Sequence, residues 1–225
     1  MSSTIAVDQP RVQEEEPRAS GAVVPDDAVA LHAVPAPAET REPARIDRPA
    51  VRAAVTAMLR ALGRDPGTES LAETPRRVAD AFAELLTPID FDATTFANDE
   101  GYDELVVVRD IPFHSLCEHH LLPFYGTASI AYLPGDRLIG LSKLPRMLEY
   151  CARDLQVQER LTAQVADRLQ AVLHPRAVGV VLTAEHECMR LRGVKTAGAA
   201  TTTSALRGLL RTDRDLRREF LDGLR

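Results

Sequence analysis

The chain has 225 residues, 45% of them apolar, which is enough to build one sizeable hydrophobic core. Its net charge of -6 and its dispersed basic residues argue against a nucleic-acid-binding surface. No apolar run approaches the roughly 20 residues that cross a bilayer, and the N-terminus lacks the pattern of a signal peptide. Composition therefore predicts a cytoplasmic protein that binds neither nucleic acid nor membrane.

Residues 1–45 differ in composition from the rest of the chain. They contain prolines and acidic residues but no aromatic residue, and the first aromatic side chain is Phe82. Such a segment cannot bury enough apolar surface to offset the entropy lost on ordering it. We expect a disordered tail over 1–45 and a single folded domain over 46–225.

After the tail, the hydrophobic pattern predicts two helices. Apolar residues at helical spacing indicate a helix over 51–62, with Asp47 as its N-cap. A second helix is predicted to begin at Thr74, where a capping hydroxyl precedes a proline, and to stop at Pro88.

The remaining sequence mixes strand and helix patterns. The predicted elements are a strand over 104–111, a hairpin of 126–133 and 137–141, helices over 143–154 and 157–173, strands over 178–183, 188–194 and 200–206, and a last helix from about 213. Helices and strands come in blocks and do not alternate strictly. The predicted fold class is therefore α+β, with a mostly antiparallel sheet packed against helices.

Two short motifs, Cys117-Glu118-His119-His120 and His186-Glu187-Cys188, carry candidate metal ligands. The chain has only 3 cysteines, and two of them fall in these motifs. Cys117 and His120 are close enough in a turn to bind one ion, and Cys188 would complete the set from a distant segment. Cys2His is the ligand pattern of a catalytic zinc site whose fourth position is left to water. The alternatives are buried cysteines without a ligand role, or a Cys117–Cys188 disulfide, which needs an oxidising compartment that the sequence does not indicate.

Four blocks, in this order and spacing, resemble the GTP cyclohydrolase I family. They are CEHHLLPF at 117–124, GLSKLPR at 140–146, QVQERLT at 156–162 and EHECMRLRGV at 185–194, and the resemblance runs from about residue 50 to the C-terminus. The family implies the tunnelling fold, in which subunits join their antiparallel sheets into rings and two rings stack as a decamer. It also implies hydrolysis of GTP at carbon 8 of guanine, release of formate, and rearrangement to 7,8-dihydroneopterin triphosphate. Residues 46–225 would then form one catalytic domain.

By this resemblance, one Zn²⁺ per subunit would be bound by Cys117, His120 and Cys188, and would lower the pKa of a water molecule toward neutrality. The guanine must also be protonated at nitrogen 7, and His186 and His119 match the acid/base positions of the family. An extended backbone at His186 and Cys188 would place both side chains on one face, beside the metal. For each histidine the alternative is a residue that only orients a ligand.

The resemblance also assigns residues to the substrate. Glu159 would accept the two adjacent N–H groups of the guanine edge, with Gln158 as a further polar contact, although the helix dipole alone favours a glutamate in a first turn. Ser142 matches a serine used in the ribose rearrangement, although helix capping would also explain it. The expected triphosphate ligands are Lys143, Arg146, Arg192 and Arg77.

Several positions depart from the family pattern. They are Ser129, the segment 68–71, Pro145 and Glu187, which would add a carboxylate near the metal. None of them removes an expected ligand or catalytic histidine, so they bear on efficiency and assembly.

Three rival functions fit the sequence less well. A zinc nucleobase deaminase would need a Cys-x-x-Cys motif, which this chain lacks. Nitrile reductases of the same fold use a cysteine nucleophile and NADPH, and lack this Cys/His/Cys set. A zinc-stabilised scaffold without activity would be expected to lose the catalytic groups, whereas His119, His186, Gln158 and Glu159 are all present.

Overall fold

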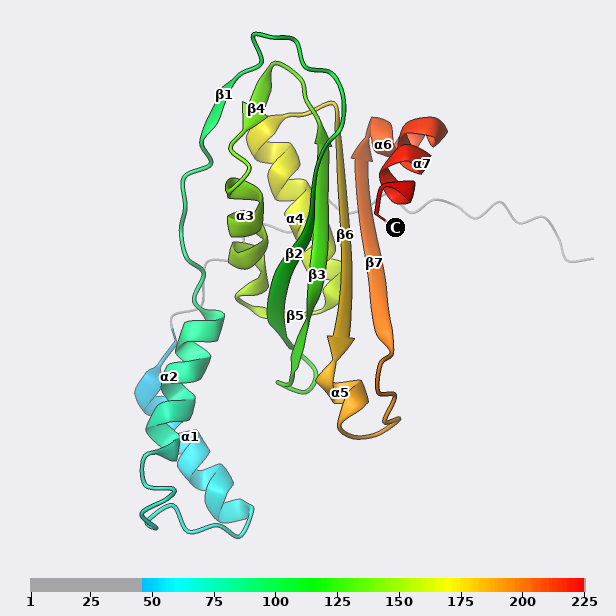
Figure 1. The fold of residues 1–225 in the computed structure, drawn as a ribbon. Helices are drawn as coiled ribbons and strands as arrows, with labels where there is room; N and C mark the ends of the chain where they lie inside the picture. The colour runs from blue at the N-terminus through cyan, green and yellow to red at the C-terminus, as the bar shows by residue number, and fades with distance from the viewer. Residues whose placement is uncertain (1–45, 225) are drawn as a thin grey trace, which may run out of the picture. The chain divides into compact units, whose positions relative to one another are not determined.

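The computed structural model describes residues 46–224, so the expectation of a tail over 1–45 lies outside the described residues. The helices are α1 (Arg48–Ala61), α2 (Thr74–Leu86), α3 (Lys143–Ala152), α4 (Gln158–Leu173), α5 (Glu187–Arg190), α6 (Leu209–Thr212) and α7 (Arg214–Asp222). The strands are β1 (Thr95–Ala97), β2 (Val106–Cys117), β3 (Pro123–Leu133), β4 (Arg137–Ile139), β5 (Leu155–Gln156), β6 (Ala177–His186) and β7 (Ala200–Gly208) (Figure 1). No helix in this part of the chain is both long and apolar enough to span a membrane.

The main sheet contains five of the strands described between residues 46 and 224, in the order β5-β2-β3-β6-β7. The long pairs β2–β3, β3–β6 and β6–β7 are antiparallel, and only the short β2–β5 pair is parallel. β2 is irregular between Val108 and Ile111, where Asp110 adopts a positive φ of 56°. A mostly antiparallel sheet packed against helices confirms the predicted α+β class.

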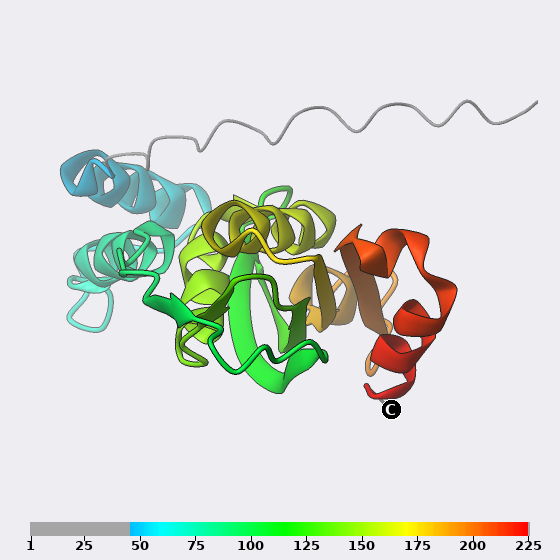
Figure 2. The same ribbon diagram turned by 90° about the horizontal axis from the view of Figure 1, so that it is seen from above.

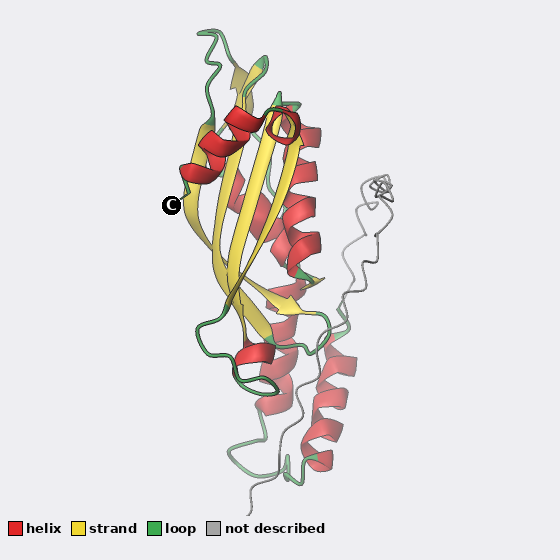
Figure 3. Cartoon of the chain, turned by 90° about the vertical axis from the view of Figure 1, so that its right-hand side faces the viewer, coloured by secondary structure: helices red, strands yellow, loops and turns green. Residues whose placement is uncertain are grey.

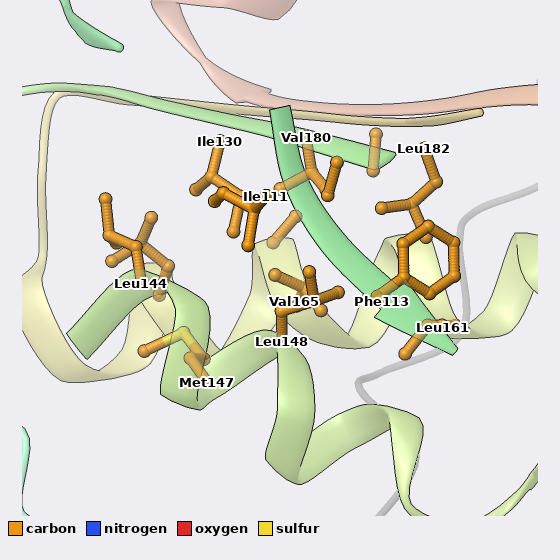
Figure 4. Packing of buried hydrophobic residues seen from close by; sticks show 14 of the residues in the cluster. Ile111, Phe113, Ile130, Leu144, Met147, Leu148, Leu161, Val165, Val180 and Leu182 are labelled. Carbon is orange, nitrogen blue, oxygen red and sulfur yellow. The ribbon is translucent and has the colours of Figure 1, made fainter. Parts of the chain in front are cut away.

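The larger core lies between one face of this sheet and helices α3 and α4. Alternate strand residues point to the same face of a sheet, and residues three or four apart share one face of a helix, so both patterns converge here. The side chains that interlock include Ile111, Phe113, Ile130, Val180 and Leu182 from the strands and Leu144, Met147, Leu148, Leu161 and Val165 from the helices (Figure 4). Burying each such side chain contributes roughly 1.5–3 kcal/mol, which holds α4 and the sheet in a fixed relation.

A smaller core lies on the other face of the sheet, beneath the C-terminal helices. Leu210 of α6 and Phe220 of α7 are buried against Ala131, Leu133 and Ala177. Figures 2 and 3 show α6 and α7 at one end of the sheet, on the face away from α4. Farther along β3, Tyr125 and Thr127 are exposed.

The N-terminal helices α1 and α2 pack against each other. Asp47 caps α1 as predicted, because its carboxylate accepts a hydrogen bond from the Ala50 amide at 3.0 Å. The prediction that Thr74 caps α2 was wrong. Thr74 is the first residue of α2, and the N-cap position belongs to Glu73, whose carboxylate pairs with Arg76 at 2.7 Å.

Two predicted strand assignments were also wrong. The segment 137–141 does not form a hairpin with 126–133, because β4 pairs with β1 and β3 pairs with β2 and β6. The segment 188–194 is no strand, since the chain turns into α5 directly after β6 and then into an exposed loop. The short helix α6 was not predicted, whereas Asp213 caps α7 near the expected start.

Candidate active site

The first two candidate ligands lie in the turn that joins β2 to β3. Cys117 ends β2 and is buried, and the chain reverses within the next few residues to begin β3 at Pro123. The amide of Leu121 donates to the Cys117 carbonyl at 2.9 Å, and Leu121 has a positive φ of 55°. The turn brings the Nδ1 atom of His120 to 3.9 Å from the Sγ atom of Cys117.

The third candidate ligand, Cys188, follows the end of β6. Cys188 is the second residue of α5, and its thiol, the Cys117 thiol and a ring nitrogen of His120 all lie within 4.8 Å of one another. A tetrahedral zinc ion with these ligands separates its donor atoms by roughly 3.5–3.8 Å. The three residues therefore fit a zinc ion after small side-chain adjustments. Both thiols are free, so no disulfide joins them.

The electrostatics of this cluster favour a cation. Burial raises the pKa of Cys188, and the neighbouring Cys117 thiol raises it further. Two thiolates at this separation repel each other, and a divalent cation would reverse that penalty. His119 lies close to Cys117, with 3.7 Å between Nδ1 and Sγ, but it does not belong to the three-residue group. Arg192 contacts the other side of His120, with 3.5 Å between Nη1 and Nε2.

The backbone around His186 differs from the extended conformation that the sequence analysis had considered. It is the last residue of β6, and α5 begins immediately after it, so His186 and Cys188 do not share one face of an extended strand. Its ring stacks on Phe124, its cross-strand partner in β3, with ring centroids 4.7 Å apart and planes inclined by 3°. Burial lowers the pKa of His186, and the nearby Glu159 carboxylate opposes that effect.

Gln158 holds the His186 ring in its rotational position. The Gln158 side chain is buried, and its Nε2 atom donates to the carbonyls of Leu182 and Thr201 and to the Thr203 hydroxyl at 2.9–3.1 Å. These acceptors fix the orientation of the amide, so Oε1 faces His186 and accepts from its Nε2 atom at 2.8 Å. We expected a substrate contact from this side chain. Its contacts within the chain could not be found by sequence reasoning, because they depend on the pairing of β6 with β7.

The expected substrate residues of α3 lie away from the cysteines of the same chain, whereas Arg192 contacts His120. Ser142, Lys143 and Arg146 lie at the start of α3, and the Ser142 side chain does not cap that helix. The opposite end of α3 leads to β5, which pairs with Cys117, and ten helical residues span about 15 Å. Arg77, on α2, lines a surface depression with residues 68–70.

Glu187 does not face the cysteine cluster as the sequence had suggested. Its Oε1 atom accepts a hydrogen bond from the Tyr125 hydroxyl at 2.8 Å and an ion-pair contact from Arg190 at 3.2 Å. In the turn between β2 and β3, the Glu118 carboxylate forms an ion pair with Arg160 at 2.6 Å. Neither Tyr125 nor Arg160 was singled out from the sequence, since their partners come from distant elements.

Comparison with known proteins identifies the family of this chain. The family model described as GTP cyclohydrolase I matches residues 51–225. GTP cyclohydrolase 1 of Streptococcus thermophilus is 49% identical over 179 residues, covering 78% of this chain and 96% of that protein. The Aquifex aeolicus protein of the same name is 49% identical over 176 residues, with the same coverage, and that of Mycolicibacterium paratuberculosis is 48% identical over 188 residues, covering 81% and 92%. The archaeosine synthase QueF-Like aligns with a TM-score of 0.37 at 18% identity, over 47% of this chain and 94% of that one, a likeness too weak to bear on function. The chain belongs to the GTP cyclohydrolase I family.

Proposed function

We propose that this enzyme hydrolyses GTP at carbon 8 of guanine in a zinc-dependent reaction, releases formate, and forms 7,8-dihydroneopterin triphosphate. The observation that carries the proposal is the convergence of Cys117, His120 and Cys188 within 4.8 Å, in a chain whose relatives are GTP cyclohydrolases. These three residues would hold one Zn²⁺ per subunit. When bound, the ion would activate a water molecule as the nucleophile.

The proposed acid/base groups are His186 and His119. The stacking of His186 on Phe124 and its hydrogen bond to Gln158 restrict both tilt and rotation of the ring. Gln158 takes the hydrogen on Nε2, so proton exchange with guanine nitrogen 7 would use Nδ1. His119 is exposed in the turn beside Cys117, where it could exchange a second proton.

The proposed substrate contacts come from several separate elements of the chain. Glu159 is exposed at the start of α4, near His186, where its carboxylate could accept the paired N–H donors of guanine. Lys143, Arg146, Arg192 and Arg77 would bind the triphosphate, and Ser142 would act in the ribose rearrangement. The start of α3 lies away from the cysteines of its own chain, so we propose that it serves the site of a neighbouring subunit, in a homodecamer with interfacial active sites.

The experiment is a single reaction of the full chain with GTP, with and without added zinc. We expect formate release and pterin absorbance in the zinc-loaded sample, and loss of both after chelation. Formate without a pterin would place the fault in the later rearrangement, and no formate at all would contradict the proposal.

The product would enter a pterin, folate or deazapurine pathway as its first intermediate. We propose a cytoplasmic enzyme that acts on free GTP and needs neither nucleic acid nor membrane. Inactivating the gene and supplementing with each pathway's end product identifies the consumer.

A further inference from the structure

A closed set of polar contacts joins α5 to β3 just outside the candidate metal ligands. The Tyr125 hydroxyl donates to Glu187 Oε1 at 2.8 Å, and Arg190 Nη1 donates to both the Tyr125 oxygen at 2.8 Å and Glu187 Oε1 at 3.2 Å. Each of the three side chains therefore contacts the other two. We call Tyr125, Glu187 and Arg190 the α5 anchor.

Burial makes the central carboxylate of the α5 anchor dependent on its partners. The Glu187 side chain is only 11% exposed, whereas Arg190 is 45% exposed. A carboxylate removed from water is costly unless hydrogen-bond donors replace its hydration, and here a phenol and a guanidinium supply them. The α5 anchor is consequently stronger than a surface ion pair of the same length.

The α5 anchor holds a short segment, in which Cys188 also packs against the larger core. α5 has four residues, too few for a helix to be stable by itself, and the loop over 191–199 that follows is exposed throughout. Cys188 is the residue directly after Glu187, and its thiol lies within 4.8 Å of the ligand atoms of Cys117 and His120. The contacts of Glu187 therefore help to fix the position of the third ligand, its neighbour in the chain.

We propose that Tyr125, Glu187 and Arg190 are positioning residues for the metal site, which hold α5 on β3 so that Cys188 stays within reach of Cys117 and His120. This inference rests on the proposed zinc function. Loss of the α5 anchor should loosen the bound ion while leaving the ligand set complete.

The test measures zinc release from the loaded, full-length protein into a chromogenic chelator. Supporting interactions around a metal site typically alter affinity 10- to 100-fold, so Glu187→Ala should release zinc on the order of 10-fold faster than the wild type. Glu187→Gln keeps an acceptor for Tyr125 and should restore part of the loss, and Tyr125→Phe should give an intermediate rate. Glu149→Ala is the matched control, because it removes the Glu149–Arg153 pair at 2.8 Å at the end of α3 and leaves α5 intact.

Two further measurements separate positioning from general destabilisation. The thermal midpoints of the metal-free variants should match that of the metal-free wild type, and the thiolate absorption of cobalt-substituted samples should weaken only in the α5 anchor variants. If Glu187→Ala does not fold, Tyr125→Phe decides the question. Zinc release within two-fold of wild type in Tyr125→Phe and the folded Glu187 variants would overturn the inference with the proposed function intact. A wild type that binds no zinc would overturn both.

Discussion

Cys188 is the residue on which the metal assignment depends most directly. It is the only candidate ligand outside the 117–120 turn, and three protein ligands leave no redundancy. Cys188→Ser should lose both zinc and turnover, as measured by metal analysis and formate release.

Cys151 provides the matched control for that experiment. It lies on α3, and burial raises the pKa of its thiol to about 11, so it stays neutral and binds metal poorly near neutral pH. Cys151→Ser should keep zinc and activity. Zinc retained in Cys188→Ser, or lost in Cys151→Ser, would contradict the proposed ligand set.

His186 tests whether proton transfer can be separated from metal binding. It contacts Gln158 and Phe124, and it stands outside the group of candidate ligands. His186→Ala should therefore keep about one zinc per subunit, while turnover falls by at least roughly 100-fold, the lower range for general acid–base groups. Loss of zinc in this variant would make His186 a ligand.

The structure also removes a complication from the His186 experiment. Glu187 adjoins His186 in the sequence, but its carboxylate is engaged with Tyr125 and Arg190. We therefore expect no replacement of the lost acid by Glu187, and in zinc-saturated samples any residual turnover in His186→Ala should persist when Glu187 is changed to Gln. A residual rate that depends on Glu187 would mean that its side chain can turn toward the substrate.

At the scale of elements, the close contact between β6 and α7 predicts that an added side chain at Gly179 destabilises the fold. A Cβ atom on Gly179 would lie 2.6 Å from Phe220 Cε1, closer than packed atoms approach. Gly179→Ala should displace α7 and lower the free energy of unfolding by about 1–3 kcal/mol, measured by urea denaturation. Gly140→Ala is the control, because its new methyl would meet Lys143 Cγ at an ordinary 3.6 Å.

The spacing of apolar residues along the sequence predicted most helices and strands, because the buried positions of each element recur every few residues. α4 is an example, since Leu161, Val165 and Leu169 mark its buried face in the sequence. The failures have a different cause. β1 and β5 are too short to show a period, and which strand pairs with which depends on contacts between distant segments.

The candidate site shows the same division between local and distant information. The types of residue at 117–120 and 186–188 predicted a metal cluster, because few other functions need cysteine and histidine together. The sequence could not predict the orientation of His186 or Glu187. Both depend on where β6 ends and α5 begins, and on partners such as Gln158 and Tyr125 from other elements.

At the scale of the whole molecule, the N-terminal segment can be tested by deletion. The family match begins at residue 51, and α1 begins at Arg48. Deleting residues 1–45 should leave turnover within a few-fold of the full chain, measured under the same zinc loading. An insoluble or inactive product would show that the segment contributes to folding or assembly.

Assembly can be measured independently of activity. The proposed decamer of 24.6 kDa chains should sediment as a species ten times the chain mass. A zinc-loaded monomer with full turnover would contradict interfacial active sites, because Lys143 and Arg146 would then have to act within their own chain.

The candidate ligands also have a consequence for the lifetime of the protein. Cys117 ends β2 and Cys188 lies two residues beyond the end of β6, and both strands pair with β3, so a shared ion would tie together points about 70 residues apart in the chain. In the chain-entropy model, a permanent cross-link of that span restricts the unfolded state by about 4 kcal/mol. A reversible metal cross-link would act in the same sense while it is occupied. Zinc scarcity would then shorten the survival of the enzyme against proteolysis as well as stop its catalysis.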